Sequence, residues 1–395
     1  MVDLKYKKNK KFELALLSNY FLILSCVFLP LQFLSLKVSS SSYDLSVFFV
    51  IGFIVCKIFY ANISLLKVLK FILVLIIYII NSFYLDFSDP GRFVSAFTWI
   101  SFLLIIIFFS SDLNFDAKIT YYFIFIPLFF IAIYSIFEYM IFGVQRPKST
   151  FDEPSYAGLC FYSVSVGFIA RYYFCNIKKF NYLLFASIFF YAGVLTKSMH
   201  IITFLISLIF LLCSTKKFSI IRIIFFIILI FVLIFIIILS DIHYLNRLNI
   251  FNPKNVSLLV WLRGLDQAIF VINNFPLFGT GLGSTGEFEF NSSSNKLLSY
   301  YKLHTLNLTD AYSMLFRLFI EVGLIGVIFF LYNFILKYKN FLSISKNNMK
   351  NQIFCFFFAL TLIIGILIKE PSYSRSYVFL SALIYFTILN KNNIK

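Results

Sequence analysis

Residues 241–307 read DIHYLNRLNIFNPKNVSLLVWLRGLDQAIFVINNFPLFGTGLGSTGEFEFNSSSNKLLSYYKLHTLN. This polar stretch interrupts a chain that is 61% hydrophobic and only 13% charged. A globular surface needs about a quarter of charged residues, so these fractions exclude an ordinary soluble domain. The sequence therefore predicts a polytopic membrane protein in which this stretch is the one large loop outside the bilayer.

The apolar runs on either side of the loop have the length of membrane-spanning helices, about 17 to 25 residues. They are too long and too evenly apolar for barrel strands, and backbone groups in lipid must be paired internally, so we expect helices. The predicted fold is all-α, with about twelve transmembrane helices. The expected spans are 14–36, 44–60, 67–84, 93–110, 119–142, 155–174, 179–195, 199–213, 217–240, 309–336, 352–368 and 376–390.

The loop divides the chain into three parts. Residues 1–240 carry the first nine predicted spans, 241–308 form the loop, and 309–395 carry the last three. Inside the loop, Val256 to Phe275 has apolar residues at helical spacing, which predicts an amphipathic helix lying on the membrane surface.

The formal charge of +17 is distributed unevenly along the chain. With the amino terminus in the cytoplasm, most Lys and Arg fall at cytoplasmic span ends, as the positive-inside rule requires. Both termini are then cytoplasmic and the large loop lies outside, and the charge does not indicate a nucleic-acid partner. The six cysteines lie inside spans or at their cytoplasmic ends, so neither a disulfide framework nor a zinc site is expected.

Several cations are predicted to lie at the outer mouth of the bundle. Guanidinium groups bind phosphate oxygens with paired hydrogen bonds, so these positions are candidates for substrate binding. Arg317 stands out because a charge about two turns into an apolar span tends to face a protein cavity. An ion pair with Glu321, on the same helical face, is the alternative. The candidates are Arg146, Lys197, Arg263, Arg317 and Arg375.

Three residues could accept a proton near that mouth. Glu153 lies where the chain enters a span, His304 near the end of the loop, and Asp310 at the start of the next span. A carboxylate or a neutral imidazole there could act as general base toward a sugar hydroxyl. A helix-start acid and a surface histidine are the alternatives for Glu153 and His304. We found no serine-hydrolase, P-loop or metalloprotease motif and no DxD-like metal site outside the membrane, so we expect a metal-independent reaction without a cofactor.

Four segments together resemble the O-antigen ligase and O-antigen polymerase superfamily of bacterial envelopes. The first is Arg146 with Phe151-Asp152-Glu153-Pro154-Ser155, and the second is Leu195-Thr196-Lys197-Ser198. The third is Trp261 and Arg263 followed by Pro276, Gly279, Gly281 and Gly283, and the fourth is Glu321-Val322-Gly323-Leu324-Ile325-Gly326. They occur in the family's order over residues 140–335.

The resemblance implies an inverting glycosyl transfer in the bacterial inner membrane, on its periplasmic side. A glycan on undecaprenyl diphosphate would move to a sugar hydroxyl of an acceptor, with Arg146 and Arg263 contacting the diphosphate. Gly279 and Gly281 would position the backbone. A chain-length regulator and a flippase would be its partners.

The resemblance leaves more than one function open. His304 lies farther from Glu321 than the histidine of the ligases does, which favours the polymerase over the ligase that transfers the polymer to lipid A core. A lipid-linked oligosaccharide transporter is the alternative from another class.

Overall fold

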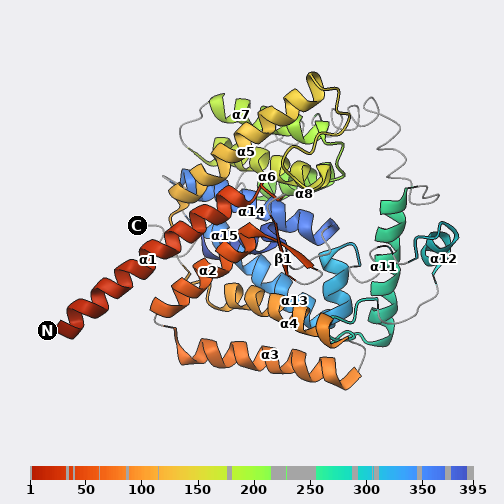
Figure 1. The fold of residues 1–395 in the computed structure, drawn as a ribbon, viewed down its shortest axis with the longest axis horizontal. Coiled ribbons are helices and arrows are strands. Elements are labelled where there is room, and N and C mark those ends of the chain that lie inside the picture. The colour runs from red at the N-terminus through yellow and green to blue at the C-terminus, as the bar shows by residue number, and fades with distance from the viewer. Residues whose placement is uncertain are drawn as a thin grey trace.

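The computed structural model describes residues 2–32, 35–38, 41–61, 63–85, 89–113, 115–175, 180–214, 228, 255–286, 292–304, 306, 311–344, 349–369 and 375–388. Helices dominate these ranges (Figure 1), and a short antiparallel hairpin pairs β1 (Ser35–Val38) with β2 (Ser41–Asp44). The helices are α1 (Val2–Phe28), α2 (Leu45–Tyr60), α3 (Leu65–Leu85), α4 (Pro90–Phe108), α5 (Ala117–Met140), α6 (Pro154–Phe174), α7 (Phe180–Leu195), α8 (Ile201–Cys213), α11 (Val256–Asn274), α12 (Ser293–Tyr300), α13 (Met314–Ser343), α14 (Lys350–Lys369) and α15 (Ser376–Thr387).

The helical prediction is confirmed for the described residues. Each expected span coincides with a helix, except 217–240, of which the structure describes residue 228 alone. The first span was predicted to run to residue 36, but α1 ends at Phe28 because the following segment enters the hairpin. The hairpin and α12 were not predicted, since both are short and rich in serine.

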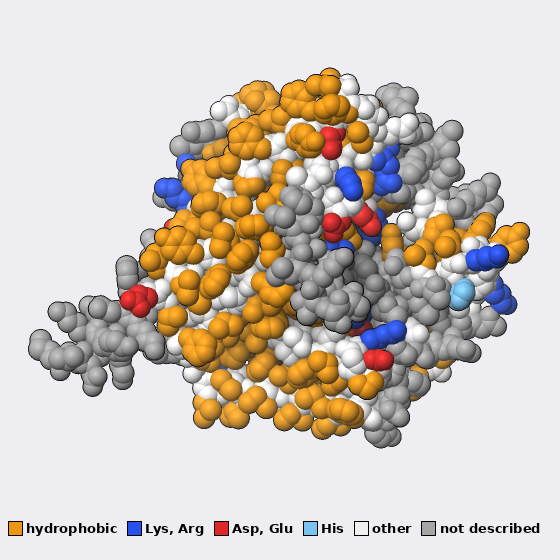
Figure 2. Space-filling view, viewed as in Figure 1, with side chains coloured by type: hydrophobic (Ala, Val, Ile, Leu, Met, Phe, Trp, Pro, Cys, Tyr) orange, Lys and Arg blue, Asp and Glu red, His pale blue; other side chains and the backbone are white. Residues whose placement is uncertain are grey.

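Six described helices are long and apolar enough to cross a membrane: α3, α4, α5, α11, α13 and α14. Shorter apolar helices accompany them in α1, α2, α7, α8 and α15. Such a set is compatible with a multi-pass membrane protein. Figure 2 shows broad hydrophobic areas on one face of the molecule, with charged side chains gathered between them.

Local sequence signals set where several helices begin. Asp89 precedes α4 and its Oδ1 accepts the backbone amides of Gly91 and Arg92, at 2.7 and 3.2 Å. Pro90 occupies the first helical position, where a missing N–H is harmless. Asp116 caps α5 in the same way, accepting from the amide of Lys118 at 2.7 Å.

The core of the bundle is built on α6 and α14. Most residues of both helices are buried and none is fully exposed, which agrees with sequences that are apolar on all sides. Gly167 of α6 lies so close to α14 that an added Cβ would come within 2.9 Å of the Phe354 ring. Small residues at such crossings let helices approach closely, which is how helices pack in lipid.

Four helix ends lie close together: the starts of α2, α6 and α15 and the end of α14. The starts of α2, α6 and α15 are joined by ion pairs, and the end of α14 is bonded to the start of α6. The helix α11 lies crosswise to α3 and α4, at the side where α12 also lies, whereas α1 begins at the opposite side (Figure 1). Because α11 also has the length and hydropathy of a span, its placement on the membrane surface stays a prediction.

A break in α13 fixes the glycine-rich segment that follows α11. Gly323 has φ 64° and ψ −169°, so the helical hydrogen bonds stop there. The segment fills the gap: the amide of Thr280 donates to the Ile320 carbonyl at 2.7 Å, and the amide of Leu324 donates to the Pro276 carbonyl at 2.9 Å. The broken helix therefore keeps its backbone groups paired, as an apolar surrounding requires.

Two glycines leave room for the glycine-rich segment to cross α13 at its break. Gly279 has φ +70°, and a Cβ there would lie 2.3 Å from the Ile320 carbonyl oxygen. A Cβ at Gly323 would lie 2.4 Å from the Gly279 amide nitrogen. Both positions therefore require glycine, for conformation and for space.

Gly279→Ala is expected to lower the thermal midpoint of the detergent-purified protein strongly, because a left-handed alanine and a backbone clash add together. The strained conformation alone costs about 1–3 kcal/mol, and the clash adds to it. Gly143→Ala is the matched control, since Gly143 has φ +64° with nothing near its missing Cβ. Equal losses for the two variants would contradict the crossing.

Candidate functional site

The start of α6 is the point at which several predicted site residues meet. Glu153 precedes the helix with an extended backbone, and Pro154 takes its first position. Thr150 ties this entry to the end of α1, its Oγ1 donating to the Pro30 carbonyl at 2.7 Å. The chain is thus held in place just where the helix presents its amide-bearing, partly positive end.

Two cations from the last helices contact this entry. One Arg375 nitrogen lies 3.1 Å from Oδ2 of Asp152 and 3.4 Å from Oδ1 of Asp44. Its guanidinium also lies over the Tyr156 ring, 5.2 Å from the centroid. Lys369, the last residue of α14, donates from Nζ to the Ser155 hydroxyl at 2.8 Å.

Two more predicted cations reach the same region from the other side. Gly158 of α6 packs against the turn after α7, where a Cβ would lie 2.6 Å from the Thr196 hydroxyl. Nε of the half-buried Arg146 donates to the Thr196 carbonyl at 3.4 Å. Lys197, next in the chain, has φ 50° and is half-buried.

We name Arg146, Glu153, Lys197, Lys369 and Arg375 the α6 cluster. Four of these residues are cations. Lys369 and Arg375 contact the start of α6, and Arg146 and Lys197 belong to the contact between residue 146 and the turn after α7, which packs against Gly158 of α6. Guanidinium and ammonium groups beside a helix N-terminus suit a phosphate or another anion. The arrangement could therefore hold an anionic group next to an acidic side chain.

Arg263, by contrast, is engaged with the protein itself. It is buried, and its guanidinium donates to the His304 carbonyl at 2.7 Å and to the Leu306 carbonyl. Burial of a guanidinium is tolerated where hydrogen bonds satisfy it. The structure thus shows Arg263 holding the segment after α12 against α11, and its predicted diphosphate contact stays a prediction.

The predicted glycines are also engaged with the protein. Gly279 to Thr285 are buried, and the close approaches that the glycines permit are to protein atoms. A Cβ at Gly281 would lie 2.8 Å from the Ser82 backbone, and the next amide, of Leu282, donates to the Ser82 hydroxyl at 2.9 Å. The segment is therefore clamped between α3 and α13, a packing role that the sequence did not predict.

Arg317 forms the ion pair that the sequence offered as the alternative. Its Nε lies 2.8 Å from Oε1 of Glu321, and the Thr285 hydroxyl donates to the same oxygen at 2.9 Å. The Glu321 side chain is fully buried and that of Arg317 nearly so. The pair links α13 to the glycine-rich segment, beside the break at Gly323.

The three predicted proton acceptors are placed differently. Glu153 is exposed, and its carboxylate makes no capping hydrogen bond to α6. The His304 side chain is exposed on the segment after α12, and the His304 carbonyl accepts a hydrogen bond from Arg263 of α11. Asp310 lies outside the described residues. Of the three, Glu153 is the acceptor that lies next to cation-bonded residues in the chain, between Asp152 and the first turn of α6.

Sequence reasoning missed Lys369. It ends an apolar run, so a charge at a span mouth was the available signal. His200 is buried at the start of α8, with Nδ1 3.2 Å from the Thr203 hydroxyl. Within the described ranges, no group of three or more His, Cys, Asp or Glu side chains could hold a metal ion.

Comparison with known proteins adds no assignment to this geometry. No family model matches the sequence, and no curated protein is detectably similar to it. Any function for the α6 cluster has to be argued from its own residues.

Glu321→Gln is expected to lower the unfolding free energy by about 3–5 kcal/mol, because it leaves the largely buried Arg317 guanidinium without its counter-charge. The double variant Arg317→Met with Glu321→Gln should recover part of that loss. Thermal or denaturant unfolding of the purified protein measures both.

The comparison pair is Lys67 and Asp112, which are 2.5 Å apart but partly exposed. Asp112→Asn there should cost less than about 1 kcal/mol. A Glu321→Gln variant as stable as Asp112→Asn would show that the α13 ion pair does not stabilise the break.

Proposed function

We propose that the protein is a glycosyltransferase of the bacterial inner membrane that polymerises surface polysaccharide, in the manner of an O-antigen polymerase. It moves a glycan from undecaprenyl diphosphate onto a sugar hydroxyl of a second lipid-linked unit, without a metal. Both termini are cytoplasmic, and the large loop and the α6 cluster face the periplasm. A chain-length regulator and a flippase would act with it.

The observation that carries this proposal is the gathering of four cations around the start of α6. A diphosphate leaving group develops negative charge, and preorganised cations stabilise that charge where no metal neutralises it. Arg146 offers a guanidinium whose described partner is a neutral carbonyl at 3.4 Å. A phosphate oxygen would be a stronger partner for it than that carbonyl.

Glu153 supplies the second requirement of the reaction. Its exposed carboxylate can take the proton of the acceptor hydroxyl, whose oxygen then bonds to the anomeric carbon. The bond from that carbon to the diphosphate oxygen breaks, and the lipid diphosphate leaves with the electron pair. A single displacement of this kind inverts the anomeric configuration.

A transporter of lipid-linked oligosaccharides is the second candidate, because α13 is a discontinuous helix. Transporters place the ends of such half-helices at the substrate. Here the ends are bonded to Thr280, Pro276 and Leu277 of the glycine-rich segment instead. The break is filled by protein, which favours the enzyme over the transporter.

Arg146→Ala is expected to abolish the long polysaccharide ladder on a gel of surface glycans, because one of the diphosphate-binding guanidiniums is lost. A polymerase defect leaves core carrying a single repeat unit. A ligase defect leaves bare core while lipid-linked polymer accumulates. Arg146→Lys should rescue poorly if paired guanidinium contacts matter.

Lys148→Ala serves as the control, since Lys148 is exposed and only two positions away. It should keep the full ladder. Immunoblots of the membranes must show equal amounts of each variant. A full ladder with Arg146→Ala would remove the α6 cluster from the reaction.

A further inference from the structure

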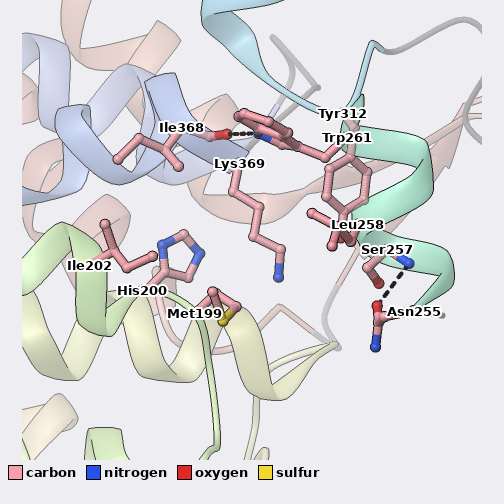
Figure 3. A pocket seen from close by; sticks show the side chains of 10 residues that line it. All are labelled: Met199, His200, Ile202, Asn255, Ser257, Leu258, Trp261, Tyr312, Ile368 and Lys369. Atoms are coloured by element: carbon pink, nitrogen blue, oxygen red, sulfur yellow. Dashed lines mark hydrogen bonds between the residues drawn. The ribbon is translucent and has the colours of Figure 1, made fainter. Parts of the chain in front are cut away.

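A cavity of about 180 Å³ lies beside the α6 cluster. Its walls come from the start of α8, the first half of α11, the end of α14 and Tyr312, which precedes α13. Figure 3 shows the Lys369 side chain reaching from the end of α14 into the space between Met199 and Leu258. The cavity therefore joins the predicted loop helix to the bundle.

The walls of the cavity are mainly apolar. Met199 and Ile202 line it from the α8 side, Leu258 and Trp261 from α11, and Ile368 from α14. The Trp261 indole is fixed there by a 3.0 Å hydrogen bond to the Ile368 carbonyl. An apolar cavity of this kind favours a hydrocarbon occupant over a sugar, whose hydroxyls would be left unpaired.

The size of the cavity limits what it can take. A cavity of about 150 Å³ in another protein admits benzene. This one therefore accommodates roughly one five-carbon isoprenoid unit, and not a long lipid chain.

The positive charge of Lys369 indicates that the group attached to this hydrocarbon is an anion. Lys369 lines the cavity and its ammonium group also bonds to Ser155, in the first turn of α6. Ser155 is two residues from Glu153 in the chain. An anion at this ammonium would thus lie beside both the apolar cavity and the first turn of α6.

We propose that the cavity binds the carrier end of the lipid substrate, with the first isoprenoid unit inside it and a phosphate oxygen against the Lys369 ammonium. This inference rests on the proposed function and adds to it a residue and a subsite. It also orients the substrate: the lipid points toward α11, and the sugar on the diphosphate points toward Glu153.

The test is binding of farnesyl diphosphate to the full-length protein in nanodiscs, with inorganic pyrophosphate and farnesol as the two partial probes. Farnesyl diphosphate should bind more tightly than either partial probe, because the site contacts both the isoprenoid and the diphosphate. Lys369→Met should weaken it about tenfold or more, the effect of losing one hydrogen bond to a charged group. Lys369→Arg should retain most of the affinity.

Two further variants separate a specific loss from misfolding. Leu258→Trp fills the cavity and keeps the charge of Lys369. It should therefore weaken the binding of farnesyl diphosphate and leave the binding of pyrophosphate unchanged. Lys296→Met, on the exposed face of α12, should change nothing. Unaltered binding in both Lys369→Met and Leu258→Trp would overturn the subsite, and so would equal affinity for pyrophosphate and farnesyl diphosphate.

The polysaccharide ladder distinguishes this inference from the function on which it rests. If Lys369→Met no longer binds farnesyl diphosphate while Arg146→Ala keeps the full ladder, the cavity binds the lipid and the proposed reaction is wrong. If Arg146→Ala loses the ladder while Lys369→Met binds farnesyl diphosphate normally, the reaction stands and the subsite is wrong.

Discussion

Charged and backbone polar groups inside an apolar bundle must be paired, and this constraint organises the molecule. Removing an ion from water costs several kcal/mol unless a partner and hydrogen bonds compensate. Arg317 meets the requirement with Glu321, and Arg263 meets it with two carbonyls. The backbone groups freed by the break at Gly323 are paired with amides and carbonyls of the glycine-rich segment.

These paired groups form a rigid clamp. They fasten α11 and the segment after it to α3 and α13, and Gly264 of α11 lies so close to Ala311 that a Cβ would meet its carbonyl at 2.0 Å. Trp261 extends the same contact to the end of α14. The loop helix is thereby held across the bundle, where it forms one wall of the cavity next to the α6 cluster.

The sequence predicted the helices well and the roles of single residues unevenly. Apolar runs of spanning length are a local signal, so α2 to α8 and α14 could be predicted within a few residues. Arg263 and Arg317 were selected because a cation near an apolar span suggests a ligand, but both guanidiniums bind protein groups. For Arg263 those groups are carbonyls about forty residues away, a pairing that no local pattern encodes.

The gathering of the α6 cluster was equally out of reach from spacing alone. Arg146 and Arg375 were each selected as exterior cations, yet their contacts with Thr196 and Asp152, on two segments that meet at α6, depend on how distant helices pack. Lys369 was missed because one lysine at a span end is ordinary. Its bond to Ser155, more than two hundred positions earlier, distinguishes it.

A cryo-electron microscopy map of the protein in nanodiscs with undecaprenyl diphosphate tests the central claim most directly. The account predicts diphosphate density within hydrogen-bonding distance, about 3 Å, of Arg146 or Lys369 at the start of α6. Density against Arg263 and the glycine-rich segment, or at the opposite end of the bundle, would contradict it.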